Sequence, residues 1–271
     1  MSHRWTTFLA CLLCSVFLLT DSAAAIAANS DSTSVSSAIN KAGRQRMLVQ
    51  RMAKAWIMIG MGIQPEHGRK ILDESRARFE QQLTELREFS PNEDVRLSLV
   101  QLDREWRDFR TALDATPGRQ HAQAVYDHSE LAQNAAHRLT LGYEKVAGAP
   151  SGRLINIAGR QRMLSQRLAK FWLLEAWEMN TVAARMESNF ARAEFASGMH
   201  QLYGTKTSSP EIGRAVEQLE RDWIAYREAL AERRNPATMR RAAPVVTELS
   251  ERVLASAEQL VALYDSQTGA R

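Results

Sequence analysis

The chain has 271 residues, of which 45% are hydrophobic and 24% are charged, and this balance excludes a wholly disordered protein. Its length suits one large domain or two modules of common size. The formal net charge is only +4 and no recognisable nucleic-acid-binding motif is present, so nothing favours a nucleic-acid-binding protein. Glycine (13 residues) and proline (7 residues) are scarce, which favours helices.

The first 28 residues have the pattern of a secretory signal peptide. Arg4 precedes an almost wholly apolar run at 6–19, and small residues follow that run. The run is short for a membrane-spanning helix, which needs about 20 residues, so an uncleaved anchor is the less favoured alternative. Both cysteines, Cys11 and Cys14, lie inside this segment, and the mature chain would therefore contain no thiol. We expect an exported, periplasmic protein.

An internal repeat follows the signal segment. The phrase INKAGRQRMLVQRMAK at 39–54 returns as INIAGRQRMLSQRLAK at 155–170, with three differences in 16 positions. A second pair, LDREWRDFRTAL at 102–113 and LERDWIAYREAL at 219–230, occurs in the same order, which indicates a tandem duplication. The predicted parts are a signal peptide, a flexible serine-rich segment, a first helical module, a linker and a second helical module, at 1–28, 29–35, 36–146, 147–153 and 154–267.

Each half has the pattern of four helices, and no convincing strand pattern appears. In the first half the predicted helices cover 36–62 and 69–89, then end near residue 115 and near residue 146. Ser90 precedes a proline and has the signature of a helix N-cap, as do Ser209 and Asn235 in the second half. The predicted fold is all-α, with two tandem up-down four-helix bundles related by internal duplication.

The third helix of each half presents an apolar stripe. Its members are spaced by four, three and four residues, which places them on one helical face. They are Leu102, Trp106, Phe109 and Leu113 in the first half, and Leu219, Trp223, Tyr226 and Leu230 in the second. We interpret both tryptophans as core residues.

The repeated phrase predicts a helix with one apolar and one polar side. The polar side carries Asn40, Gly43, Arg44, Arg46, Gln50, Arg51 and Lys54, which return as Asn156, Gly159, Arg160, Arg162, Gln166, Arg167 and Lys170. A solvated face is the ordinary interpretation of such residues. Charged positions elsewhere differ between the halves, as Arg107 differs from Ile224, whereas this whole face recurs. We therefore favour a function for it.

The chemistry of this polar side favours a small anion. A guanidinium group offers a planar set of donors that matches a flat oxyanion, and it keeps its charge. Glycine lets a second helix or a ligand approach the backbone, and the amides add neutral donors. Two such faces would repel each other unless an anion lay between them. We expect the two copies to meet within one chain, as an internal pseudo-dimer, or across a homodimer.

The repeated phrase resembles the signature of the type IV pili methyl-accepting chemotaxis transducer N-terminal domain, the PilJ-type domain. It is also similar to a motif in the periplasmic sensor domain of NarX-type nitrate/nitrite kinases. The resemblance implies a helical extracytoplasmic sensor that binds nitrate or nitrite between the first helices of two subunits. By the spacing G-x-x-R-M, the anion-contacting arginine falls on Arg46 and Arg162. The further expected ligand-binding residues are Gly43, Gly159, Asn40, Asn156, Gln50 and Gln166.

Receptors of this family carry a transmembrane helix and a cytoplasmic signalling module, and neither is recognisable in this sequence. We therefore expect a membrane receptor or kinase as a partner, and no nucleic acid. The main alternative is a helical protein–protein interaction module that uses the Arg/Gln face without a small ligand. An enzyme is disfavoured, because the mature chain has no cysteine, no Glu-x-x-His pair and no H-E-x-x-H motif.

No cofactor and no metal ion are expected. The histidines after the signal segment are scattered and do not recur between the halves, so we interpret them as surface or hydrogen-bonded positions. They are His67, His121, His128, His137 and His200.

Overall fold

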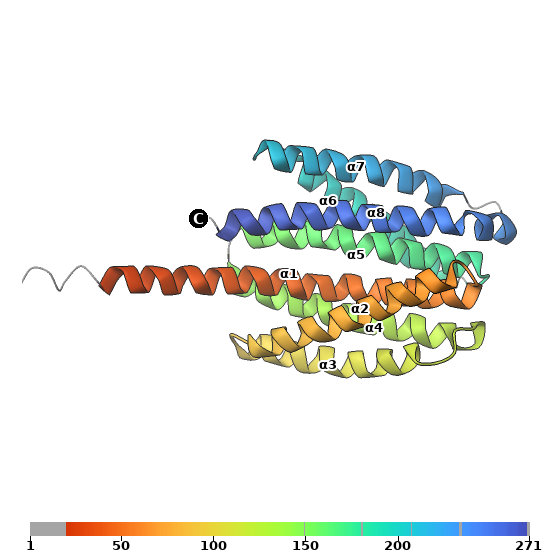
Figure 1. Ribbon diagram of the computed structural model, residues 1–271, viewed down its shortest axis with the longest axis horizontal. Helices are drawn as coiled ribbons and strands as arrows, with labels where there is room; N and C mark the ends of the chain where they lie inside the picture. The colour runs from red at the N-terminus through yellow and green to blue at the C-terminus, as the bar shows by residue number, and fades with distance from the viewer. Residues whose placement is uncertain (1–19, 149, 180, 207, 233–234, 270–271) are drawn as a thin grey trace, which may run out of the picture.

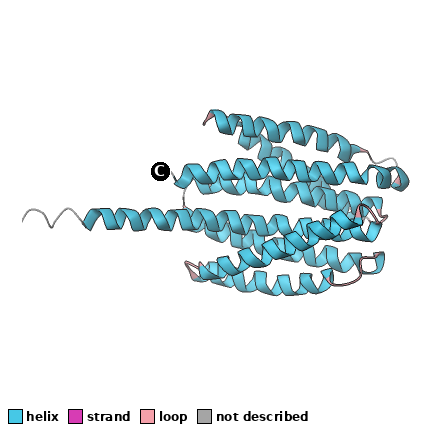
Figure 2. Ribbon diagram, in the orientation of Figure 1, coloured by secondary structure: helices cyan, strands magenta, loops and turns pink. Residues whose placement is uncertain are grey.

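The computed structural model describes residues 20–148, 150–179, 181–206, 208–232 and 235–269 (Figure 1). Over these residues the chain forms eight helices and no strand (Figure 2). The helices are α1 (Thr20–Met61), α2 (Pro65–Glu88), α3 (Glu93–Leu113), α4 (Arg119–Ala147), α5 (Pro150–Ala176), α6 (Val182–Tyr203), α7 (Pro210–Ala231) and α8 (Pro236–Gly269). The all-α prediction is confirmed.

The helices form two groups of four, α1–α4 and α5–α8. In each group the first helix packs against the second and the fourth, and the third packs against the fourth. This is the predicted pair of up-down four-helix bundles. No helix among the described residues is both long and apolar enough to cross a membrane.

The first helix begins earlier than predicted. Because α1 starts at Thr20, the serine-rich segment 29–35 is part of this helix, and its predicted flexibility stays a prediction. Alanines at 23–25, 27 and 28 precede this segment, and neither glycine nor proline interrupts residues 20–42. Residues 1–19 lie outside the described residues, and the signal peptide stays a prediction.

Two of the three predicted N-caps are present, and the third lies at a different residue. Ser209 and Asn235 cap α7 and α8, as predicted, because their side chains accept hydrogen bonds from backbone N–H groups three residues later. Ser90 does not cap α3, because Asn92 accepts from the Val95 N–H at 2.9 Å and the helix starts two residues later. Asparagine is among the best N-cap residues, and the acidic residues after it favour a helix N-terminus.

The connection between the two bundles is shorter than predicted. The helix α4 ends at Ala147, Gly148 adopts the left-handed conformation that often follows a helix, and α5 begins at Pro150. Residues 150–153, predicted as linker, therefore belong to α5. This short connection starts α5 beside α1, and the two helices run in the same direction with extensive contact (Figure 1).

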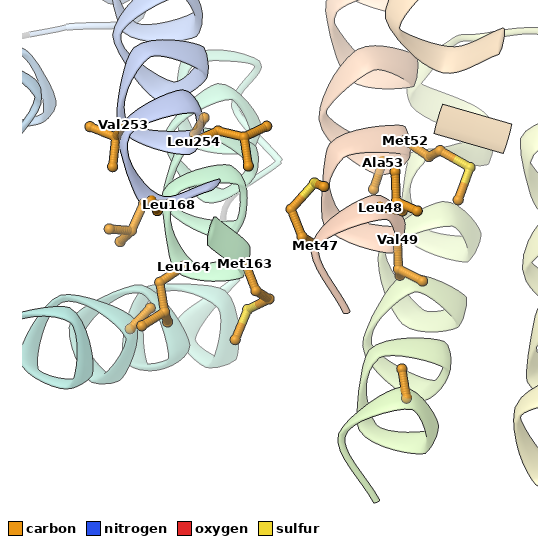
Figure 3. Close-up of a cluster of buried hydrophobic side chains, with 14 of the residues drawn as sticks. Met47, Leu48, Val49, Met52, Ala53, Met163, Leu164, Leu168, Val253 and Leu254 are labelled. Atoms are coloured by element: carbon orange, nitrogen blue, oxygen red, sulfur yellow. The ribbon is translucent and has the colours of Figure 1, made fainter. Parts of the chain in front are cut away.

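The apolar stripes of α3 and α7 are buried, as predicted. Trp106 stacks on Phe79 of α2 with ring centroids 4.2 Å apart, and Trp223 stacks on Phe195 of α6 at 3.9 Å. The apolar side of α1 faces its own bundle, whereas Met47 lies on the side that faces α5 and α8 (Figure 3). The buried hydrophobic residues of the two bundles form one continuous core, and α1 and α5 lie where the bundles meet.

Candidate functional site

The polar sides of α1 and α5 are buried between the bundles. The side chains of Arg46, Gln50 and Lys54 have no exposed surface, and neither do those of their counterparts in α5, Arg162, Gln166 and Lys170. Buried charges are costly unless they are paired and hydrogen-bonded. The interpretation as a solvated face is therefore wrong, because the chain itself covers this face.

The two arginines cross between the repeats. Arg46 Nη2 donates to Asn156 Oδ1 at 2.8 Å, and Arg162 Nη1 donates to Asn40 Oδ1 at 3.1 Å. Each arginine thus binds the asparagine of the other repeat, which gives the pair an approximate two-fold relation. We call Arg46, Arg162, Asn40 and Asn156 the arginine layer.

Acidic residues of the fourth and eighth helices hold the two asparagines. Asn156 Nδ2 donates to Glu144 of α4 at 2.6 Å, and Asn40 Nδ2 donates to Asp265 of α8 at 3.1 Å. These bonds fix each amide so that its oxygen is directed to an arginine. The same geometry is therefore built twice, once from each repeat.

Two glycines allow the arginines to come this close. A Cβ atom at Gly43 would lie 3.2 Å from Nη2 of Arg46 and 3.5 Å from Nη2 of Arg162. A Cβ atom at Gly159 would lie 3.0 Å from Nη2 of Arg162. Both guanidinium groups therefore lie close to Gly43 of α1, where a larger side chain would crowd Arg46.

Burial and neighbouring positive charges act on both arginines. Burial, followed by the charges of Arg160 and Arg162, lowers the pKa of Arg46 to about 9. Burial also lowers the pKa of Arg162, against the opposing effect of Glu258. Arginine stays protonated in proteins near neutral pH. The arginine layer is thus a buried site with two neighbouring positive charges.

The two arginines have different acidic surroundings. Arg162 Nη1 lies 2.8 Å from Oε2 of Glu258 on α8. The same carboxylate also accepts two hydrogen bonds from Arg44, at 2.8 and 3.1 Å. Arg46 has no such carboxylate among its hydrogen-bond partners in the described part of the chain. Its Nη1 lies 3.2 Å from Nδ1 of His137 on α4.

His137 is neutral near pH 7. Burial, followed by the charges of Arg46, Arg160 and Arg138, lowers its pKa to about 4. Because Arg46 can only donate, we assign Nδ1 of His137 as the acceptor and place the ring proton on the other nitrogen. The Arg46 half of the layer therefore carries more uncompensated positive charge than the Arg162 half.

A second polar layer lies further along α1 and α5. Lys54 Nζ donates to Glu251 at 2.5 Å and to Ser250 at 3.0 Å, both on α8. In the same way, the counterpart of Lys54 in α5 binds α4. Lys170 Nζ donates to Glu130 at 2.6 Å and to Ser129 at 3.0 Å. We call these six residues the lysine layer.

The lysine layer is a pair of crossed, buried ion pairs. Burial alone would raise the pKa of each glutamate, but Lys170 and Arg167 bring that of Glu130 down to about 2, and Lys54 and Arg51 do the same for Glu251. Each lysine of one bundle depends on a carboxylate of the other. These pairs tie the two bundles together.

Gln50 and Gln166 contact the lysine layer rather than the arginine layer. Gln50 Nε2 donates to Glu130 at 3.0 Å, and Gln166 Nε2 donates to the backbone oxygen of Ser250 at 2.9 Å. The structure thus brings six of the eight predicted ligand-binding residues together around the arginines. The predicted contacts of these two glutamines to an anion stay a prediction.

Sequence reasoning missed the residues that α4 and α8 contribute. His137 was interpreted as one of five scattered histidines, although it contacts Arg46. The signal that could have found it is a shift of 121 residues, which aligns Ser129-Glu130 with Ser250-Glu251. The same shift places His137 on Glu258, so the fourth helices of the two repeats also match. Within the described parts of the chain, no group of three or more His, Cys, Asp or Glu side chains is arranged to hold a metal ion.

Two linked four-helix bundles with a buried, crossed arginine layer define a duplicated helical module. The sequence model of the PilJ family, described as the type IV pili methyl-accepting chemotaxis transducer N-terminal domain, matches residues 27–131 and 149–265. The matched residues are most of the chain, and the protein belongs to this family, with two matched segments in tandem. Members are non-catalytic sensory modules. Comparisons with the curated proteins and with the solved structures give no significant match.

Proposed function

We propose that the protein is an exported sensory module that binds a small planar oxyanion, of the nitrate or nitrite kind, between α1 and α5. The observation that carries the proposal is the pair of buried guanidinium groups of Arg46 and Arg162, which both lie against Gly43. Two neighbouring positive charges repel each other. An anion between them is attracted to both and offsets this repulsion.

The donors around the arginines fit such a ligand. A guanidinium group and a planar oxyanion match in shape and in hydrogen-bond direction. Among the described residues, Nε of Arg162 is buried without a hydrogen-bond partner. A ligand oxygen would satisfy this donor, whose burial without a partner is otherwise costly.

Binding at this place can be transmitted as a helix movement. α1 and α5 belong to different bundles and meet at the arginine layer, so an anion that binds one separation better than another shifts the relation of the bundles. PilJ-type domains relay signals to transducers. We propose that a membrane receptor or kinase recognises this shift. The contact would take place on the outer side of the membrane, because the predicted signal peptide implies export.

The alternative, a protein-interaction module that uses the Arg/Gln face, has less support. Arg46, Gln50 and Lys54 are covered by α4, α5 and α8. A protein partner would have to separate the two bundles to reach them. The contact of α1 with α5 inside one chain also supports the internal pseudo-dimer rather than pairing across a homodimer.

Calorimetric titration of the chain without its predicted signal segment tests the proposal. We expect saturable binding of nitrate or nitrite that is lost in Arg46→Gln and in Arg162→Gln. Arg96→Ala, which removes an exposed arginine of α3, is the control and should bind as the wild type does. Absence of binding to any small oxyanion by a folded wild-type protein would favour the interaction module instead.

A further inference from the structure

We propose that the carboxylate of Glu258 is a tethered competitor of the external anion, and that it sets the affinity of the arginine layer. This inference rests on the proposed anion binding and concerns its regulation. It assigns a role to a residue of α8 that lies outside the repeated phrase.

The first observation is the difference between the two repeats at this position. The shift that aligns α4 with α8 keeps the serine and glutamate of the lysine layer and places His137 on Glu258. Arg162 therefore has a carboxylate where Arg46 has a neutral imidazole. One of the two buried guanidinium groups therefore binds a carboxylate directly, whereas the other does not, because Glu144 and Asp265 bind the asparagines of the layer.

The second observation is the position of Glu258 at the edge of the site. Its side chain is 29% exposed, whereas that of Arg162 is fully buried. A groove of about 790 Å³ runs along α1, α2 and α8, and Arg44 and Glu258 are among the residues that line it. Glu258 thus stands between this groove and the buried guanidinium of Arg162.

The third observation is that Glu258 has a second hydrogen-bond partner, Arg44, which can pair with it when Arg162 does not. Arg44 binds both carboxylate oxygens, and its side chain is 23% exposed. When an anion takes the place of Glu258 at Arg162, the carboxylate can stay with Arg44 and gain water. Displacement therefore does not leave a buried, unpaired charge, which would be the costly outcome.

A carboxylate presents two oxygens in a plane, as nitrate and nitrite do, so the two anions compete for the same donors. The tethered carboxylate also acts at the high effective concentration of an intramolecular ligand. The external anion has to replace a charge-assisted hydrogen bond at Arg162, whereas at Arg46 it meets a neutral histidine. Glu258 therefore lowers the apparent affinity of the whole layer.

The test compares nitrate binding by the wild type and by Glu258→Gln with calorimetry of the full mature chain. We expect the variant to bind nitrate about tenfold tighter or more, because a charged hydrogen bond no longer has to be displaced. Asp103→Asn is the matched control. It removes a similarly exposed carboxylate, 32% against 29%, which pairs with Arg87 of α2 rather than with a residue of the arginine layer. It reports the effect of net charge alone and should change the affinity much less.

The reverse substitution gives a second arm. His137→Glu places a carboxylate beside Arg46 and makes the two halves alike, so we expect nitrate binding to weaken about tenfold or more. This variant adds a partner to a buried charge, so it keeps the test open if Glu258→Gln does not fold.

The outcomes separate the inference from the proposed function. Nitrate binding by the wild type that is unchanged in both Glu258→Gln and His137→Glu would overturn the role of Glu258 and leave anion binding intact. An increase of the same size in Asp103→Asn would also overturn it. Binding by Glu258→Gln but not by the wild type would support it strongly. Absence of binding in the wild type and in both variants would overturn the anion site and the inference together.

Discussion

The lysine layer and the arginine layer are built from the same duplicated helices, yet only one of them is the same in both repeats. In the lysine layer each lysine binds a serine and a glutamate of the other bundle, at closely similar distances. In the arginine layer Glu258 faces one arginine and His137 faces the other. The difference separates a layer that holds the bundles together from a layer in which one copy has changed.

The chemistry of the two cations explains why the layers differ in this way. A buried lysine presents one compact charge, and loss of its carboxylate leaves that charge without compensation. A guanidinium group spreads its charge over five donors, so Arg46 can be satisfied by Asn156, His137 and a backbone oxygen. The arginine layer therefore tolerates a neutral partner, and the lysine layer does not.

The largest expected effect comes from breaking the lysine layer. Glu251→Gln leaves Lys54 buried without a carboxylate, and Glu130→Gln does the same to Lys170. We expect each to lower the free energy of unfolding by about 3–5 kcal/mol in urea denaturation. Glu93→Gln, which removes one side of an exposed ion pair on α3, should change it by less than about 1 kcal/mol. If the two buried variants differed by several kcal/mol, the layer would not be symmetric in energy.

The next largest effect is expected from alanine substitutions at the two glycines beside the arginine layer. Alanine in a helix is ordinarily more stable than glycine by about 1 kcal/mol, but here its Cβ would press on a buried guanidinium group. We expect Gly43→Ala and Gly159→Ala to destabilise the protein by about 1–3 kcal/mol, as overpacking does. At Gly142 on α4 the nearest atom would be Val95 Cγ2 at an ordinary 3.4 Å. Gly142→Ala should therefore be neutral or stabilising.

Equal effects of alanine at all three glycines would show that the arginines move away at little cost. The measurement is again the midpoint and slope of urea denaturation. A change in slope would indicate that a variant alters the compactness of a state rather than its stability alone.

The sequence predicted the fold and the two repeats, because both are written in local patterns, and the resemblance to the PilJ-type signature led to the pair Arg46 and Arg162. Helix periodicity gave the bundles, and near-identity of 39–54 with 155–170 gave the paired face. It did not predict that α4 and α8 close over this face, because that depends on how the helices pack. The role of His137 was missed for the same reason, since its partner Arg46 lies 91 residues away.

The two halves of the arginine layer should respond to low pH in different pH ranges. The pKa of His137 is about 4 in the folded protein and about 6.5 when unfolded, so between these values only the unfolded state binds the proton. Stability therefore falls as the pH drops from about 6.5 to 4. The pKa of Glu258 is about 2, because Arg162 and Arg44 outweigh burial, so its contribution is lost only below about pH 4.5. We expect a loss of about 1–2 kcal/mol from His137, reduced by partial exposure.

Urea denaturation at pH 7, 6 and 5 measures this effect, and His137→Gln is the matched variant. The wild type should lose stability across this range relative to the variant, because the glutamine side chain does not titrate. Parallel curves for the two proteins would mean that His137 titrates normally and that the two halves do not differ in the way proposed.

The smallest expected effect concerns the outer faces of α2 and α6, where the repeats also differ. Phe79 and Phe195 occupy equivalent places against Trp106 and Trp223, at a shift of 116 residues. The same shift aligns the exposed charged residues Glu66, Lys70 and Glu74 of α2 with Val182, Met186 and Phe190 of α6. The three residues of α6 are 65%, 54% and 62% exposed, so they contribute little to the core. The double substitution Met186→Lys and Phe190→Glu, which copies α2, should change the free energy of unfolding by no more than about 0.5 kcal/mol. It should also reduce self-association in light scattering at high protein concentration, because it removes exposed apolar surface. A loss of several kcal/mol would mean that this face of α6 is packed in solution and that the difference between the repeats extends beyond the arginine layer.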